Sequence, residues 1–265
     1  TGKLYEEEIP KPRIFSDIRR KYHRYGLPME RLEGAMRQAG HVDAVLVTCP
    51  MTYWYRGAFE AIALAKKVWP KAPVFLGGIY ATLCGEHARR FSGADEVLPG
   101  PWEQNIAQFS VKTGMDISPP ADFLTSPALE LYKRLEYAPI MLTRGCPFRC
   151  AYCASGRLFD KLVRREPDEL IEEIARSTRI GINDFAFYDD ALLYEPEKAL
   201  VPLLENIIES RLKIRLHAPN GMHIAAIDKE LAKLMRRAGF QTIRLGVESL
   251  SKSKHDEWGA KADPG

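Results

Sequence analysis

The chain has 265 residues, of which 46% are hydrophobic and 28% charged, and its formal net charge is +3. This composition is typical of a globular protein with enough apolar side chains for a core, and so small a net charge does not by itself indicate binding to nucleic acid or membranes. No apolar run approaches the 18 residues that a membrane-spanning helix needs. Five cysteines and an N-terminus without an apolar signal segment do not fit a secreted disulfide framework, so we expect a cytoplasmic protein.

The first hundred residues alternate between helical and strand patterns. Met29, Leu32 and Met36 form one stripe of a predicted helix over 29–39, and the run DAVLVT at 43–48 is typical of a buried strand. The alternation continues with a helix over 57–69, a strand over 73–78 and a third strand within 94–100. It predicts a parallel, doubly wound α/β sheet. Because only about three strands are visible, we expect a Rossmann-like domain over residues 1–109 that is partial at its N-terminus.

Residues 110–137 break this alternation with several prolines, and we interpret them as a linker. A second alternation begins at residue 138. Strands are expected at 139–144, 183–190, 213–217 and 242–249, and helices at 167–178, at 195–210 and after Asp228. Four consecutive strand–helix units are about half of an eight-fold barrel. Residues 138–265 are therefore expected to form a partial (β/α) barrel that is truncated on its C-terminal side.

The stretch TRGCPFRCAYCASG, residues 143–156, places Cys146, Cys150 and Cys153 within eight positions. It follows a predicted strand and precedes a helix, so it is expected at the C-terminal edge of a parallel sheet, where active sites of such folds lie. Three thiolates at this spacing can converge on one metal centre. A closed zinc site and a saturated iron–sulfur cube both need a fourth ligand, so three cysteines leave one position open for chemistry. A zinc site completed by a distant histidine, and accidental spacing, are the alternatives.

The C-x3-C-x2-C motif, with Tyr152 before its last cysteine, resembles the radical S-adenosylmethionine (radical SAM) superfamily over about residues 138–250. The resemblance implies that Cys146, Cys150 and Cys153 ligate a 4Fe–4S cluster and act as the catalytic centre. It also implies that S-adenosylmethionine binds the open iron and is cleaved by one electron to methionine and a 5′-deoxyadenosyl radical. Tyr152 would then lie near the adenine.

Polar residues at other strand ends are further candidates for binding this cofactor. Asp189 and Asp190 end the second strand, where the resemblance implies an acceptor for the methionine ammonium; a solvated strand end or a helix cap is the alternative for either. Glu248, at the end of the fourth strand, is implied to bind the ribose, or else pairs with a nearby arginine. Asn220 is a candidate after the third strand, as are His217 and His223, for which structural roles remain open.

Two loops in the first domain are expected at the crevice edge of its sheet. MTYWYRG at 51–57 offers aromatic surface, and GGIYATL at 77–83 offers close backbone approach. With the barrel behind it, the stretch from about residue 20 to 105 resembles the cobalamin-binding class of the superfamily. The resemblance implies bound cobalamin, although KYHRYG has Lys21 where a cobalt-binding motif has Asp, so His23 is interpreted as a packing or surface residue.

Together these observations predict a radical SAM enzyme that performs cobalamin-dependent methyl transfer or related radical chemistry. The resemblance implies a flavodoxin- or ferredoxin-type one-electron reductant, a small-molecule or lipid-like substrate, and poor activity of the 265-residue segment alone. A non-catalytic iron–sulfur electron carrier and a corrinoid-binding module are the alternatives. A tRNA-modifying enzyme is less favoured, because no basic stripe with interleaved aromatic residues is found, and nucleic acid is not expected as a partner.

Overall fold

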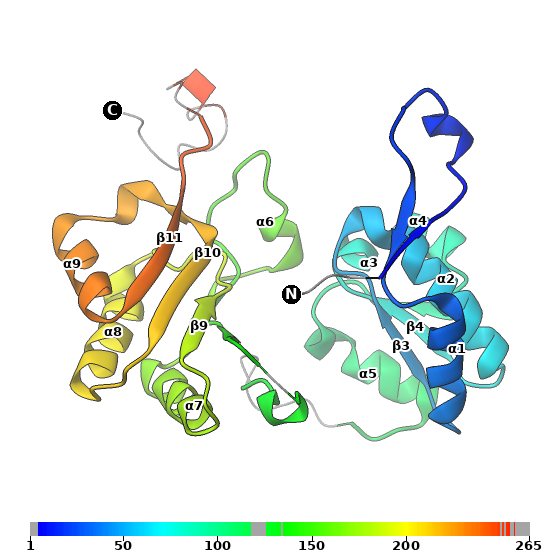
Figure 1. The fold of residues 1–265 in the computed structure, drawn as a ribbon, viewed down its shortest axis with the longest axis horizontal. Coiled ribbons are helices and arrows are strands. Elements are labelled where there is room, and N and C mark those ends of the chain that lie inside the picture. Colours follow the sequence, from blue (N-terminus) through cyan, green and yellow to red (C-terminus); the bar gives the residue numbers. More distant parts are fainter. Residues whose placement is uncertain are drawn as a thin grey trace. The chain divides into compact units, whose positions relative to one another are not determined.

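A computed structural model describes residues 5–117, 126–133 and 135–249, together with 251, 253, 254 and 257 (Figure 1). The chain divides into two compact units, Thr1–Ile117 and Ser118–Gly265. Among the described residues, no helix has the length and apolar character needed to cross a membrane.

The first unit is built on a three-stranded parallel sheet. Its strands β3 (Val45–Thr48), β4 (Val74–Gly77) and β5 (Glu96–Val97) are arranged in the order β3-β4-β5. Helix α1 (Met29–Gln38) precedes these strands, and α2 (Tyr55–Val68), α3 (Ile79–Leu83), α4 (Gly85–Phe91) and α5 (Trp102–Thr113) connect or follow them. Alternate residues of β4 enter separate cores, because Val74 and Leu76 pack with α2 while Phe75 packs with Phe109 of α5. The predicted parallel α/β arrangement is confirmed.

Two features of this unit were not predicted from the sequence. Strands β1 (Glu6–Glu8) and β2 (His23–Tyr25) form an antiparallel pair whose short segments carry no apolar alternation. Helix α5 continues to Thr113, four residues past the expected domain end, and stops at Gly114, which adopts a left-handed conformation with φ +73°.

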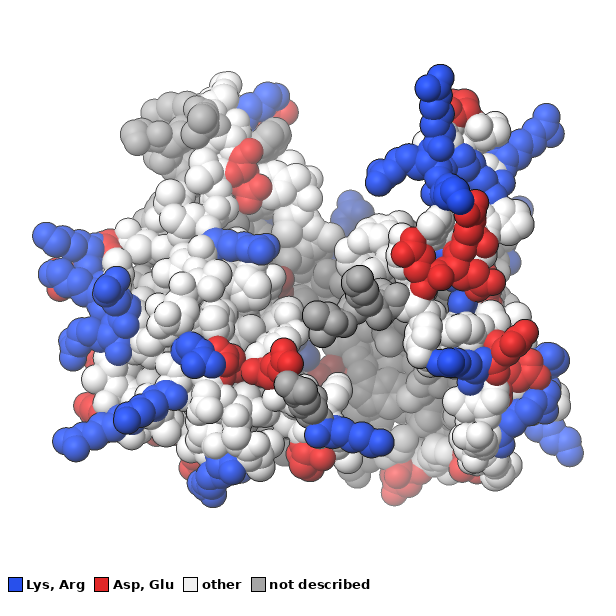
Figure 2. Space-filling view, in the orientation of Figure 1, with Lys and Arg blue, Asp and Glu red and all other residues white. Residues whose placement is uncertain are grey.

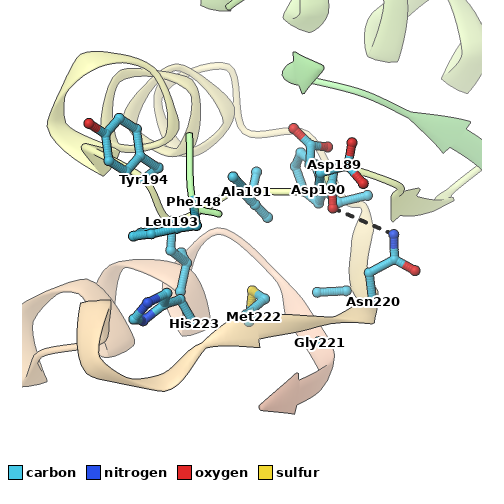
Figure 3. Close-up of a pocket in the computed structure, with 13 residues that line it drawn as sticks. Phe148, Asp189, Asp190, Ala191, Leu193, Tyr194, Asn220, Gly221, Met222 and His223 are labelled. Carbon is cyan, nitrogen blue, oxygen red and sulfur yellow. Dashed lines mark hydrogen bonds between the residues drawn. The ribbon is translucent and has the colours of Figure 1, made fainter. Parts of the chain in front are cut away.

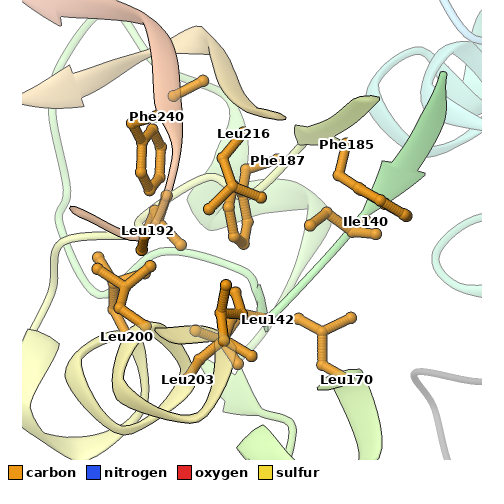
Figure 4. Packing of buried hydrophobic residues seen from close by; sticks show 14 of the residues in the cluster. Ile140, Leu142, Leu170, Phe185, Phe187, Leu192, Leu200, Leu203, Leu216 and Phe240 are labelled. Atoms are coloured by element: carbon orange, nitrogen blue, oxygen red, sulfur yellow. The ribbon is translucent and has the colours of Figure 1, made fainter. Parts of the chain in front are cut away.

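The second unit contains a four-stranded parallel sheet. Its strands are β6 (Ala138–Ile140), β9 (Asp184–Phe187), β10 (Arg215–His223) and β11 (Phe240–Gly246), in the order β11-β10-β9-β6. Helices α7 (Pro167–Arg179), α8 (Leu200–Glu209) and α9 (Lys229–Arg237) pack against it (Figure 1). Figure 4 shows the core between these layers, where Phe185 and Phe187 of β9 face Leu170 and Leu203 of the helices.

Local sequence signals account for the helix starts in this unit. Pro167 occupies the first turn of α7, where a missing N–H costs no hydrogen bond. Asp228 caps α9, because its Oδ1 accepts a hydrogen bond of 2.8 Å from the backbone N–H of Leu231. On α7, the side chain of Glu173 is buried and paired with Arg165 at 2.7 Å, which explains a charged residue on its inner face.

All four expected strands of this unit differ from their predicted extents. The strand expected at 183–190 ends at Phe187, so Asp189 and Asp190 follow β9 rather than belong to it. The strand expected at 242–249 is observed as Phe240–Gly246. The expected strand at 139–144 is divided into β6 and the short β7 (Thr143–Arg144), which pairs antiparallel with β8 (Val163–Arg164). The expected strand at 213–217 continues to His223 as β10. The edge strand β11 is mostly exposed, with Ile243 and Leu245 in contact with solvent. The remaining short elements are α6 (Ser155–Leu158) and five 3-10 turns: η1 (Arg13–Phe15), η2 (Thr52–Trp54), η3 (Leu129–Leu131), η4 (Pro196–Lys198) and η5 (Ile224–Ala226).

Candidate functional site

The cysteine loop, residues 145–154, leaves β7 and enters α6. Gly145 begins it with φ +86°, and a Cβ atom there would lie 2.5 Å from the carbonyl oxygen of Lys161. Only glycine therefore allows the loop to turn so closely against the following segment. Within the loop, the backbone N–H of Cys153 donates to the carbonyl of Cys150 at 3.0 Å.

Phe148 packs this loop against the end of β10 and the segment that follows β9. Its ring packs edge-on against Tyr194, with centroids 5.6 Å apart, and lies 5.0 Å from the ring of His223, the last residue of β10. These three residues line one pocket with residues at the ends of β9 and β10 (Figure 3): Phe187, Asp189, Asp190, Ala191, Leu192, Leu193, Ala218, Asn220, Gly221 and Met222. The pocket therefore lies at the C-terminal edge of the sheet, as predicted for the site.

The three cysteines are all free thiols: Cys150 is buried, Cys146 is half-buried and Cys153 is exposed. Among the described residues, no three His, Cys, Asp or Glu side chains lie close enough together to hold a metal ion. The thiols thus share a loop without surrounding a common centre. Their chemistry nevertheless fits an iron–sulfur cluster, because they are three thiols outside any disulfide, on a short segment without helix or strand.

Asp189 is buried and its carboxylate binds the segment that leads into the cysteine loop. Its Oδ1 accepts hydrogen bonds from the backbone N–H of Leu142 at 3.1 Å, the N–H of Thr143 at 2.5 Å and the Thr143 hydroxyl at 2.8 Å. Burial raises the pKa of Asp189 to about 7, and these hydrogen bonds oppose that shift. Asp189 therefore joins the end of β9 to β7.

Asp190, next in sequence, is exposed and faces the cysteine loop. The hydroxyl of Ser155 donates to Asp190 Oδ1 at 3.3 Å, and the thiol of Cys153 donates to the same hydroxyl at 3.4 Å. The backbone N–H of Ser155 also donates to the Cys153 sulfur at 3.5 Å. Ser155 is a link between the loop and the strand that the sequence reasoning missed; its place two residues after Cys153 is the only signal that marks it.

Asn220 and Tyr152 also interact with residues of this site. Asn220 donates from Nδ2 to the backbone carbonyl of Asp189 at 3.5 Å, as the dashed line in Figure 3 marks. The pKa of Tyr152 is raised by partial burial, by a hydrogen bond with Cys150 and by the negative charge of Glu248. Glu248 follows β11, which ends at Gly246, and interacts electrostatically with Tyr152 of the cysteine loop.

His217 does not face this site, contrary to expectation. Because β10 continues to His223, His217 is only the third residue of the strand and lies near its N-terminal end. Its Nε2 lies 3.1 Å from Asp184 at the start of β9, and its Nδ1 lies 3.2 Å from the hydroxyl of Thr242. These contacts give it a structural role.

A second pocket lies at the C-terminal edge of the sheet in the first unit. It is lined by strand ends and by the start of α5: Leu46, Val47, Thr48, Phe75, Gly77, Gly78, Leu98, Gly100, Trp102 and Asn105. Gly78 has φ +90°, and a Cβ atom there would lie 2.7 Å from Thr48 Oγ1. This conformation brings the β4–α3 turn close to the end of β3.

The aromatic run after β3 has two different orientations. Tyr53 and Trp54 are 66% and 54% exposed, whereas Tyr55 stacks on the buried Tyr80 with a centroid distance of 5.7 Å. His23 lies in β2 with its Nδ1 against the carboxylate of Glu6, as a packing histidine would.

Residues 140–264 match the Radical SAM superfamily. Three curated relatives are bacteriochlorophyllide d C-12(1)-methyltransferase of Chlorobaculum tepidum (30% identity, covering 67% of this chain and 42% of that protein), hopanoid C-2 methylase of Rhodopseudomonas palustris (27%, 67% and 37%) and anaerobic magnesium-protoporphyrin IX monomethyl ester cyclase of Cereibacter sphaeroides (28%, 43% and 19%). The chain thus spans less than half the length of each of these relatives.

A solved structure with a similar fold is that of the apo, selenomethionine-labelled cobalamin-dependent S-adenosylmethionine radical enzyme OxsB. It aligns with a TM-score of 0.67 and 13% sequence identity over 90% of this chain and 40% of that one. By this match, residues 140–264, which include the cysteine loop, form a domain of the radical SAM superfamily.

Proposed function

We propose that the protein is a cobalamin-dependent radical SAM enzyme that transfers methyl groups or performs related radical chemistry. The observation that carries the proposal is the seating of the cysteine loop: Phe148 and Asp189 hold it over the C-terminal edge of a parallel sheet, beside the exposed carboxylate of Asp190. The alternative of a plain electron carrier gives no reason for an exposed carboxylate next to the cysteines.

In this proposal Cys146, Cys150 and Cys153 hold a 4Fe–4S cluster and leave one iron open. When bound, the cluster supplies one electron that cleaves S-adenosylmethionine to methionine and a 5′-deoxyadenosyl radical. Because Cys150 is buried and Cys146 half-buried, this part of the loop is largely shielded from bulk water.

The two adjacent aspartates have separate roles. Asp190 accepts hydrogen bonds from the methionine ammonium, because it is exposed and its other contact is a single weak bond from Ser155. Asp189 is a positioning residue, because its carboxylate is already engaged with Leu142 and Thr143. Asn220 holds the backbone of Asp189 and lines the pocket that receives the cofactor.

Tyr152 and Glu248 bind the nucleoside end of the cofactor. Tyr152 is half exposed beside Cys150, so its ring is available to lie against the adenine. The carboxylate of Glu248, at the end of the fourth strand, accepts from the ribose hydroxyls.

The first unit, with its apolar pocket at the sheet edge and the exposed Tyr53 and Trp54, is proposed to hold cobalamin. Relatives named for methylating bacteriochlorophyllide d and hopanoids support a large, mostly apolar methyl acceptor. The proposal places the protein in the cytoplasm, where a flavodoxin- or ferredoxin-type protein supplies the electron.

Anaerobic reconstitution of the chain with iron and sulfide tests the radical site. We expect about four irons per chain and a paramagnetic signal of the reduced cluster that changes when S-adenosylmethionine is added, together with formation of 5′-deoxyadenosine. The Cys150→Ala variant should lose both responses. A cluster whose spectrum is indifferent to S-adenosylmethionine would favour the electron carrier instead.

A further inference from the structure

The loop between β1 and β2 is an ordered projection of the first unit. The backbone N–H of Ile9 donates to the carbonyl of Tyr22 at 3.0 Å, which extends the antiparallel pairing of the two strands to the base of the loop. Within it, the N–H of Ile18 donates to the carbonyl of Phe15 at 3.1 Å, and the rings of Phe15 and Tyr22 lie 6.1 Å apart. Residues 10–21, called the basic loop below, are therefore presented in a defined shape.

The basic loop concentrates positive charge. It contains five cationic residues and one acid, a net charge of +4, whereas the whole chain has +3: Lys11, Arg13, Asp17, Arg19, Arg20 and Lys21. Figure 2 shows these basic side chains gathered at the tip of the projection. The rest of the chain is thus nearly neutral, and this segment carries the excess.

Most of this charge is available to a partner. Lys21 pairs with Glu8 at 2.6 Å, and Lys11 donates to the carbonyl of Ile18. For Arg13, Arg19 and Arg20, no carboxylate lies within ion-pair distance among the described residues. Arg19 and Arg20 also line a groove together with Lys11 and with the Lys21–Glu8 ion pair, so cations outnumber the one carboxylate on this concave surface.

The same loop exposes large apolar side chains. Ile14 is 78% exposed, Ile18 47% and Phe15 38%. Exposing these apolar side chains to water costs free energy. A polyanion such as a nucleic acid, or an acidic protein surface, would pair with the arginines but would give the apolar side chains no apolar partner. An anionic bilayer surface suits both the arginines and the apolar side chains, because its headgroups bind arginine and its interfacial layer accepts isoleucine and phenylalanine.

We propose that the basic loop docks on membranes containing anionic lipids, with Arg19 and Arg20 on the headgroups and Ile14 and Ile18 inserted at the interface. This inference does not depend on the assignment of the radical site, since all its residues belong to the first unit. It makes the protein peripheral to the membrane, at a surface where apolar molecules concentrate.

Co-sedimentation of the chain with vesicles tests the charge contribution. Wild-type protein should bind vesicles of phosphatidylcholine with about a third phosphatidylserine, at physiological salt, far better than pure phosphatidylcholine vesicles. The double variant R19Q/R20Q should bind about 25-fold more weakly, since each basic residue near the surface contributes about fivefold. The matched control is R236Q/R237Q, which removes two adjacent exposed arginines from α9 and should bind like the wild type.

A second pair of variants tests insertion. I14S/I18S should weaken binding to the same vesicles by about tenfold or more while keeping the charge, whereas I180S, at an exposed isoleucine after α7, should not. Equal binding to neutral and anionic vesicles, or equal loss in R236Q/R237Q, would overturn the proposal. So would I14S/I18S binding as tightly as wild type, because a purely electrostatic surface would instead point to a soluble polyanion. Circular dichroism of each variant distinguishes lost binding from lost folding.

Discussion

The carboxylate of Asp189 accepts two hydrogen bonds from Thr143, one from its backbone N–H at 2.5 Å and one from its hydroxyl at 2.8 Å. Thr143 lies three residues before Cys146, so this pair connects the end of a central strand to the start of the cysteine loop. The position of the loop therefore depends on a carboxylate that is buried just after that strand.

Replacing Asp189 should be costly. In Asp189→Ala the donors of Leu142 and Thr143 lose their buried acceptor, and we expect the free energy of unfolding to fall by about 3 kcal/mol. Asp190→Ala removes an exposed carboxylate and should change it by less than about 0.5 kcal/mol. Urea denaturation of both variants measures the difference, and equal stabilities would contradict the positioning role of Asp189.

The raised pKa of Asp189 predicts a pH dependence of stability. Its pKa is about 7 in the folded chain, against about 4 in an unfolded chain. Between these values the folded state holds more protons, so this group's contribution is fully present below about pH 4 and is lost as the pH rises to about 7. Urea titrations across this range should show that loss in the wild type and a flatter profile in Asp189→Asn.

Gly145 should not tolerate a side chain. In Gly145→Ala the Cβ atom would lie 2.5 Å from the Lys161 carbonyl at φ +86°, so both strain and a backbone clash destabilise the loop. Gly181→Ala has a similar φ of +93° with no atom within 4 Å of the added Cβ, and should cost only about 1 kcal/mol of backbone strain. We expect reconstituted iron content to fall in Gly145→Ala and to be normal in Gly181→Ala. Normal iron content in both would show that the loop turn is not needed.

Ser155→Ala should separate cofactor binding from cluster assembly. It removes the hydroxyl between Cys153 and Asp190 and leaves the three thiols in place. We expect an unchanged iron content and S-adenosylmethionine binding weakened about 2- to 10-fold, the usual effect of one hydrogen bond. Ser16→Ala, at an exposed serine of the basic loop, serves as the control. Loss of iron would instead assign Ser155 to the assembly of the cluster.

Cobalamin binding to the first unit is open to a direct measurement. Tyr53→Ala/Trp54→Ala removes two exposed rings near the sheet edge, so folding should be unaffected while the affinity for cobalamin falls by about tenfold. Absorbance of cobalamin after gel filtration with the protein reports the binding. Tyr132→Ala, at an exposed tyrosine of the second unit, is the control.

The elements that the sequence predicted well are those with strong periodic signals. Asp228 and the apolar stripe of α9, or Pro167 at the start of α7, determine local structure whatever surrounds them. The β1–β2 pair could not be anticipated, because three-residue strands with charged side chains give no alternation to detect. The extent of β10 was missed because Pro219 and Gly221 look like a turn, yet the strand continues through them with irregular pairing to β11.

The cysteines and the polar residues after the neighbouring strands could be identified as site candidates from the sequence. Which of the two adjacent aspartates is buried and which is exposed could not. Asp189 and Asp190 are chemically identical and both follow the end of β9 at Phe187, yet the structure buries Asp189 and exposes Asp190. Phe148 is unremarkable within the motif, and its contacts with Tyr194 and His223 depend on residues 46 and 75 positions later in the chain.

The exposed edge of β11 bears on how this protein is handled in the laboratory. Ile243 and Leu245 lie on a strand that, among the described residues, has a neighbour on one side only. Two such edge strands from different molecules can pair through backbone hydrogen bonds. Preparations should therefore be kept dilute, and light scattering against concentration will reveal whether self-association, rather than loss of cofactor, limits the lifetime of a sample.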